Sequence, residues 1–394
     1  MAACSGLSAL SIDILLPAFP KMRKAFGLPP DSARVSLVIT ALFLGLALGQ
    51  LIYGPLSDRF GRRPLLLAGL GVFVLGALGT AFSTTLAVTL GWRFIWGLGA
   101  AACRSLSVAM VRDTSAGDRM ARTMALVMAT FIVVPVIAPA MTAALLHVAP
   151  WRIVYWIPIV CALALAVSVV LMPETLPVER RRSVGPAALL DSLRVVARNR
   201  ETVGYGLAVL FLFGVMSSYI GGSQNIFGDV FNQRDRFPIL FGVVAVGMGT
   251  GALLSARIVS RVGLSRLLRL LVVALLTNAS VLLGGAVLFG GKPPLWLFVA
   301  TLFVFLPSCS VLIANCNTAA MTPVAGVAGM AAALIGTFST AGGSLLGAVS
   351  DRSFNGTVTP FAVCGFGYAL TAAFCIRVVA QRAASTEPSL VAVR

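Results

Sequence analysis

The sequence predicts an all-α integral membrane protein with twelve transmembrane helices in two six-helix halves. Three features indicate this fold. Of the 394 residues, 58% are hydrophobic and only 11% are charged, and the mean hydropathy is +0.97. Twelve apolar runs reach the roughly 20 residues that a helix needs to cross a bilayer, and none alternates as a transmembrane barrel would. The longest polar stretch lies after the sixth run.

The first six runs form the predicted N-terminal half. They cover residues 2–20, 34–54, 64–82, 88–110, 123–146 and 152–172. The chain begins inside the first run with no basic leader, so this run is not a secretory signal. We expect the first helix to be truncated at its N-terminus, with a short re-entrant helix as the alternative. Pro135 and Pro139 predict a bend in the fifth helix, because each removes a backbone hydrogen bond.

The second six runs form the predicted C-terminal half. They cover residues 203–222, 238–258, 266–288, 295–318, 327–350 and 359–380. We therefore divide the chain into an N-terminal half at 1–172, a cytoplasmic linker at 173–202, and a C-terminal half with a short tail at 203–394. Part of the linker, 186–198, is expected to be helical. A weak repeat relates the halves: Leu56–Gly61 is matched by Ile258–Gly263, with Ser260 in place of the acid. Repeated halves are a transporter architecture.

The net charge of +17 is unevenly distributed along the loops. One side of the predicted topology collects 19 Lys and Arg residues and the other collects 9. The richer side should face the cytoplasm, which places the C-terminus there. Basic loops beside anionic lipid account for the charge, so no nucleic-acid partner is expected.

Several function classes are excluded by the residue types present. The seven cysteines and the single histidine show no metal-ligand spacing, so neither a metal nor another cofactor is expected. The chain has no P-loop lysine for ATP, and no nucleophile or paired carboxylates indicate an enzyme. A channel would show a filter-like loop or rings of charge, and neither is found.

Three charged residues lie well inside the runs: Asp13, Arg93 and Arg104. Intramembrane charges are costly and usually mark a substrate or proton route. Asp13 is the only acid that we assign to an apolar run, and a buried carboxyl can take a proton from one side and release it to the other. The alternative is a static partner for a buried arginine. Arg93 must pair with a carboxylate, a carbonyl or substrate, or else extend to the membrane surface.

A charged hinge, Gly54–Pro64, connects the second and third runs. We expect it to act as a conformational latch in which Asp58 accepts bonds from Arg59, Arg62 or the N-terminus of the eleventh helix near 326–329. The alternative is a solvated loop charge that only sets topology. The latch residues are Gly54, Asp58, Arg59, Gly61 and Arg62, with Gly61 allowing a tight turn.

These motifs resemble those of the major facilitator superfamily, and within it the drug:proton antiporters of the bicyclomycin- and chloramphenicol-resistance type. Gly54–Arg63 resembles the loop motif between spans two and three, and Arg93–Gly97 the span-four motif whose arginine is tied to proton coupling. Pro135–Pro139 resembles the antiporter motif of span five. Ser11–Pro20 resembles the first-span signature of the exporters, whose acid is implicated in protonation and drug binding. Gly326–Gly336 resembles the opening of span eleven.

The chain departs from these motifs at a few positions. Thr142 and Ala143 stand where paired glycines often end the span-five motif, and Trp96 replaces a residue that is often polar. Arg104 stands where a small or neutral residue is expected. These differences bear on substrate range more than on fold or coupling.

The resemblance implies a proton-coupled secondary transporter that exports small hydrophobic drugs or related metabolites by alternating access. It also implies multidrug efflux and antibiotic resistance, a monomer, and a place in a bacterial inner membrane. A proton-coupled importer of a small nutrient is the alternative on the same fold. Proton coupling is assigned to Asp13 and Arg93. The substrate cavity is expected to be lined by Phe43, Arg104, Phe131, Pro135, Pro139, Phe211 and Tyr219.

Overall fold

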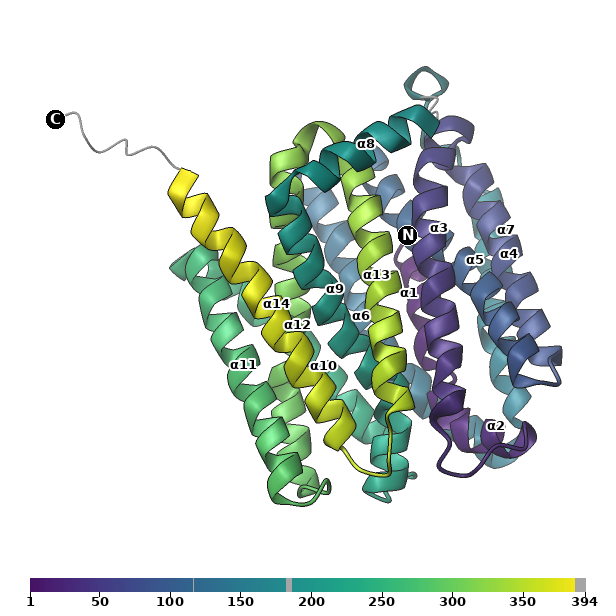
Figure 1. The fold of residues 1–394 in the computed structure, drawn as a ribbon. Coiled ribbons are helices and arrows are strands. Elements are labelled where there is room, and N and C mark those ends of the chain that lie inside the picture. The colour runs from purple at the N-terminus through teal and green to yellow at the C-terminus, as the bar shows by residue number, and fades with distance from the viewer. Residues whose placement is uncertain (116, 182–185, 387–394) are drawn as a thin grey trace.

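The computed structural model describes residues 1–115, 117–181 and 186–386, and every regular element among them is helical. Eleven helices of this described part are long and apolar enough to cross a membrane, and Val133–Val148 is a shorter apolar helix. Together they give the twelve predicted spans in sequence order, and Figure 1 shows them as one elongated helical bundle.

The first half begins with a span that is broken near its middle. Its elements are α1 (Ala2–Asp13), η1 (Leu16–Ala18), α2 (Phe19–Ala25), η2 (Ala33–Ser36), α3 (Leu37–Phe60), α4 (Arg62–Phe82), α5 (Leu86–Thr114), α6 (Gly117–Val148), η3 (Trp151–Tyr155) and α7 (Trp156–Val170). Pro17 and Pro20 stand in the first turns of η1 and α2, where the missing N–H costs no helical bond. The first span therefore continues to Ala25, beyond the predicted limit at residue 20.

The second half repeats the six-helix pattern. Its elements, with those of the linker, are η4 (Val178–Arg180), α8 (Pro186–Arg198), α9 (Arg200–Asn225), η5 (Ile226–Val230), α10 (Phe237–Val262), α11 (Leu264–Leu288), α12 (Leu295–Met321), η6 (Thr322–Val327), α13 (Ala328–Arg352) and α14 (Thr359–Thr386). The predicted linker helix at 186–198 is confirmed as α8.

Helix α8 lies across one end of the bundle, and α2 lies at the opposite end (Figure 1). We call these the linker end and the distal end. Leu193 and Val196 of α8 pack with Val324 and Met330 of the second half, so the linker helix rests on η6 and the beginning of α13.

Small residues allow the helices of the first half to approach closely. A Cβ added at Gly45 of α3 would lie 2.0 Å from the carbonyl oxygen of Phe94. One added at Gly97 of α5 would lie 2.1 Å from the carbonyl oxygen of Leu42. Neither contact leaves room for a side chain, so glycine is required where α3 and α5 cross. This packing fixes the part of α5 that carries Arg93.

The two halves meet mainly along two helix pairs, α3 with α13 and α6 with α10. Thr337 Oγ1 of α13 donates to the Ala47 carbonyl oxygen of α3 at 2.9 Å. Phe43 of α3 packs edge-to-face on Phe213 of α9, with ring centroids 5.3 Å apart. These contacts place α3, α9 and α13 at the interface on which the functional residues lie.

The predicted internal repeat is present in the backbone. Gly61 ends α3 and precedes α4 with φ of +99°, and Gly263 ends α10 and precedes α11 with φ of +77°. Both lie in the left-handed region that favours glycine. The turn is therefore repeated in the second half, although the acid of the first copy is Ser260 there.

Candidate functional site

Asp13 ends α1 in the interior of the bundle, where its side chain is 4% exposed. No ion pair to its carboxylate occurs in the described part of the chain. Tyr219 of α9, which belongs to the other half, is its electrostatic neighbour. The Tyr219 hydroxyl is buried and has no hydrogen-bond partner among the described residues. Asp13 is thus a buried acid, not held in an ion pair, facing a phenol across the interface.

Arg93 is completely buried in α5, so the alternative of an arginine extending to the membrane surface is wrong. Its Nη2 donates to the Ser11 carbonyl oxygen at 3.0 Å, and its Nε donates to the Val38 carbonyl oxygen at 3.2 Å. The guanidinium lies 4.7 Å from the ring centroid of Trp96. Arg93 therefore joins α1 to η2–α3 through backbone carbonyls.

Arg93 and Asp13 are connected through helix α1 and not through a direct ion pair. The acceptor Ser11 lies two residues before Asp13, and Thr142 of α6 donates to the Ile14 carbonyl oxygen at 2.8 Å. The turn that carries Asp13 is thus held on both sides by the motifs of spans four and five. Arg93 Nη1 has no partner among the described residues, so this guanidinium keeps a free donor.

The expected cavity residues have different packing partners. Tyr219 stacks on Phe241 within the second half, at 5.5 Å with an interplanar angle of 8°, and Phe211 packs against Tyr368 of α14. Pro135 and Pro139 both lie inside the continuous helix α6. The side chain of Phe131 lies outside the described residues. Arg104 is the member of the set that lines a described cavity.

That cavity lies at the linker end and has a volume of about 360 Å³. The first half contributes Gln50, Asp58, Arg62, Arg104 and Arg112, and the second half contributes Gly329, Met330, Ala332 and Ala333. Asp58 and the beginning of α13 therefore face the same space, as the latch hypothesis requires, although no bond joins Asp58 to the described residues of α13.

Arg62 holds the linker end of the first half together. Its guanidinium bonds Asp58 at 2.7 Å and Asp113 at 3.0 Å, joining the ends of α3, α4 and α5. Arg62 is 5% exposed, whereas the Asp58 side chain is 43% exposed. Asp58 is thus the member of this network that remains accessible to a new partner.

Glu174, which follows the sixth span, caps the beginning of α4. Its carboxylate accepts from the backbone N–H groups of Arg62 at 3.0 Å and Arg63 at 3.1 Å. Partial burial raises the pKa of Glu174, but bonds from four backbone N–H groups outweigh it and leave the pKa below its usual value. Sequence reasoning missed this residue, although a carboxylate at a helix N-terminus is a favourable arrangement.

Glu174→Gln is expected to weaken the hinge slightly, by about 0.5–1 kcal/mol, because solvent screens a carboxylate that is only partly buried. The pKa of Glu174 is lower in the folded state, so its carboxylate adds to the free energy of unfolding at every pH above its unfolded pKa. That contribution is lost as the pH falls through the folded pKa. Thermal unfolding of the purified variant should therefore differ from the wild type at neutral pH and converge with it in acid. A difference that persists in acid would contradict the charge-based role.

The distal end is closed by an ion pair between the halves. Arg23 of α2 is 2% exposed and bonds Asp229 of η5 at 2.9 Å, and it also donates to Asn225 and to the Pro30 carbonyl oxygen. Asp229 further bonds Arg234 at 2.8 Å. The first predicted span ends at residue 20, before Arg23, whereas the observed span continues to Ala25 and Arg23 is buried against the second half.

The expectation that Asp13 is the only acid within the spans is wrong. Asp351, in the last turn of α13, is 6% exposed. The predicted span ended at residue 350, one residue short of it, because the charged pair Asp351–Arg352 resembles the start of a loop.

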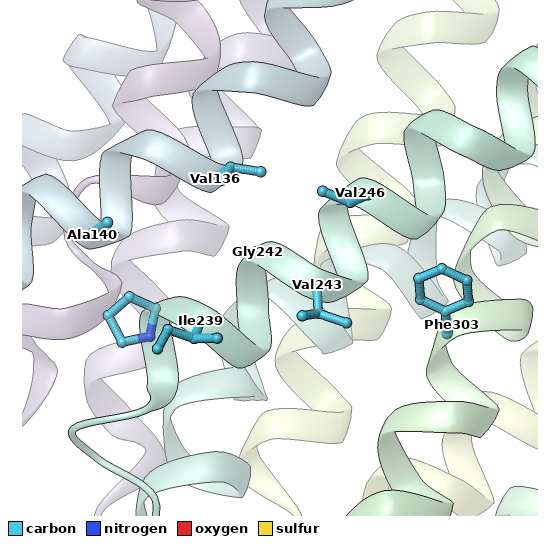
Figure 2. A pocket seen from close by; sticks show the side chains of 8 residues that line it. Val136, Ala140, Ile239, Gly242, Val243, Val246 and Phe303 are labelled. Carbon is cyan, nitrogen blue, oxygen red and sulfur yellow. The ribbon is translucent and has the colours of Figure 1, made fainter.

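A second hollow, of about 420 Å³, lies on the outside of the bundle where α6, α10 and α12 meet. Figure 2 shows Val136 and Ala140 on one helix opposite Val243, Val246 and Phe303. All of its lining side chains are apolar, and it contains none of the acids described above. It is a membrane-facing groove and not the charged site.

Comparison with protein families and curated proteins gives consistent results. Residues 1–348 match the family model described as Major Facilitator Superfamily. The chain is 31% identical over 334 residues to an uncharacterized MFS-type transporter, YdgK, of Bacillus subtilis, covering 84% of this chain and 82% of the relative. It is 27% identical to a bicyclomycin resistance protein homolog of Haemophilus influenzae (90% and 89% covered) and to a chloramphenicol resistance protein of Pseudomonas aeruginosa (87% and 80% covered).

Solved structures support the same fold. A D-xylose–proton symporter superposes with a TM-score of 0.72 over 94% of this chain and 95% of its own, at 14% identity. The human organic anion transporter MFSD10 gives a TM-score of 0.66 over 96% and 97%, at 19% identity. At these identities the likeness shows the twelve-helix fold alone.

Proposed function

The chain belongs to the major facilitator superfamily and is a multi-pass membrane transporter, and we propose that it exports small hydrophobic drugs or related metabolites in exchange for protons. The observation that carries this proposal is Asp13: a buried carboxyl that forms no ion pair within the described chain, at the interface of two halves that must move apart. The curated relatives named for bicyclomycin and chloramphenicol resistance support export of such compounds.

The arrangement of contacts supports an inward-facing state. The linker end carries most of the arginines and is the proposed cytoplasmic side of a bacterial inner membrane. There a cavity lies between the halves, while Arg23 and Asp229 join them at the distal end. Alternating access then consists of breaking the distal contacts and closing the linker-end cavity.

Export is tested in cells that accumulate a fluorescent hydrophobic drug, with a panel that includes chloramphenicol and bicyclomycin. Cells expressing the protein should accumulate less drug than cells expressing Asp13→Asn, and a protonophore should abolish the difference. Accumulation that rises on expression would favour the importer alternative. Equal accumulation across the whole panel would contradict drug export.

Asp58→Asn is expected to shift the protein further towards the inward-facing state and to slow efflux, with drug binding retained. In the proposed outward-facing state the accessible Asp58 carboxylate would bond the beginning of α13, a coupling of about 1–3 kcal/mol. Labelling of Ala332→Cys, in a background without the seven native cysteines, reports access to the cavity wall. Asp191→Asn, which removes an exposed acid of α8, is the matched control. Unchanged labelling and transport would leave Asp58 as a loop charge only.

Arg23→Gln is expected to favour opening of the distal end by about 2 kcal/mol, a low value for a buried charge pair because Arg234 still neutralises Asp229. Spin labels at Ala25→Cys and Lys292→Cys, one on each half, measure the distance between the two halves at the distal end. The control is Lys24→Gln, which changes the exposed residue next to Arg23 and should leave this distance unchanged. If Arg23→Gln also leaves it unchanged, the ion pair does not hold the distal end closed.

A further inference from the structure

Asp351 is a buried carboxyl at the distal end that the proposed exchange of drug for protons does not use. It lies where three segments from both halves meet: the last turn of α13, the last turns of α9, and η2 at the entrance to α3. A Cβ added at Gly221 of α9 would lie 2.2 Å from its Oδ2, so the glycine leaves room for the carboxyl. The acid is thus enclosed by the closed distal end.

No cation neutralises Asp351 in the described part of the chain. It makes none of the ion pairs found there, and both Arg352 and Arg34 are exposed. The groups that face it are the Ser36 hydroxyl of η2 and the Tyr368 phenol of α14, while α9 presents glycines. A carboxylate buried without a cation loses its hydration at large cost, so a neutral carboxyl is the form that fits this site.

The hydrogen bond with Ser36 agrees with a neutral carboxyl. Ser36 Oγ donates its hydrogen to the Ala33 carbonyl oxygen at 2.8 Å. A serine hydroxyl has one hydrogen and two lone pairs, so towards Asp351 it is free to accept. Tyr368 likewise donates to the Leu346 carbonyl oxygen at 3.0 Å. A protonated Asp351 supplies the donor that Ser36 Oγ can accept, which a carboxylate does not.

We propose that Asp351 is a second proton-binding site, which takes a proton from the outside and keeps the distal end closed while it is protonated. The inference rests on the proposed alternating access. When the distal end opens, the carboxyl meets outside water and releases its proton there; on closing, it takes a proton from the same side. This proton returns to the side it came from, so it regulates the opening and is not exchanged for drug.

The proposal predicts that opening of the distal end depends on pH with a definite sign. Raising the pH favours the charged carboxylate, which is stable only when hydrated, so the distal end should open. The ion pair of Arg23 with Asp229 works in the opposite direction, since Asp229 must be charged to hold the end closed. An opening that increases with pH is therefore not explained by Asp229.

The test uses the full chain in lipid nanodiscs, without its seven native cysteines and with spin labels at Ala25→Cys and Lys292→Cys. The distance between the labels should increase through a pH titration when Asp351 is present and remain at the closed value in Asp351→Asn, whose amide stays neutral. The exposed acid on the same end provides the matched control, Asp31→Asn, which should titrate like the wild type. An Asp351→Asn protein that opens with pH as the wild type does would overturn the proposal.

A second variant covers the case in which Asp351→Asn does not fold. Ser36→Ala removes the hydroxyl that lies beside Asp351, so the midpoint of the opening should move; a midpoint that stays in place would contradict the inference. Asp13→Asn distinguishes this inference from the proposed function, because it should keep the pH-dependent opening and lose coupled efflux. If efflux persists in Asp13→Asn while Asp351→Asn abolishes the opening, the exchange mechanism fails and the second site stands.

Discussion

Asp13→Asn is expected to abolish proton-coupled efflux while the protein remains folded in the membrane. The amide has nearly the size of the acid and cannot take up or release a proton. Because Asp13 makes no ion pair with any described residue, the substitution leaves no partner charge there buried and uncompensated. The measurement is drug-induced proton movement in proteoliposomes, read by a pH-sensitive dye in the lumen.

The wild-type protein and Asp31→Asn are the controls for this loss, since Asp31 is an exposed acid at the distal end. Drug binding to the purified Asp13→Asn protein should be retained or only weakened, which separates loss of coupling from loss of the site. Normal drug-induced proton movement in the variant would remove Asp13 from the mechanism.

Arg93→Ala is expected to lose coupling and also to destabilise the first half. The buried carbonyl oxygens of Ser11 and Val38 would each lose a charged donor, at about 1–3 kcal/mol for each unsatisfied group. The contact with Trp96 would be lost as well. The turn that carries Asp13 would then be held by Thr142 alone among the polar contacts described above. Thermal unfolding in detergent and coupled efflux should both decline.

Arg93→Lys separates the charge from the geometry. A lysine keeps the charge but does not provide the planar fork that reaches two carbonyls at once. Stability between that of the wild type and Arg93→Ala, with partial coupling, is the expected outcome. Full stability and full coupling in both variants would show that the bonds to Ser11 and Val38 are not needed.

The fold could be predicted from the sequence because membrane helices carry their signal locally. Apolar runs of sufficient length gave the twelve spans, and the glycine of the hinge predicted the turn that recurs at Gly263. The linker helix was also predictable, because its apolar residues recur on one face, where Leu193 and Val196 contact the second half.

The site could be predicted only in part, because its remaining contacts join distant segments. Asp13 and Arg93 were identifiable as charges within apolar runs, but the sequence did not show that Arg93 bonds carbonyls of α1 and η2–α3. Arg23 and Asp351 stand at the ends of their runs and resemble loop charges. Both are buried by contacts with the opposite half, and the hydropathy of a segment carries no information about such contacts.

The central claim, exchange of drug for protons, is tested most directly by the direction of the gradient that drives transport. Proteoliposomes containing the wild-type protein are given a pH gradient of either sign, and uptake of labelled chloramphenicol is measured. Export by antiport predicts accumulation when the lumen is more acidic than the medium, with none above protein-free vesicles for Asp13→Asn. Accumulation driven instead by an acidic medium would contradict antiport and show proton-coupled import.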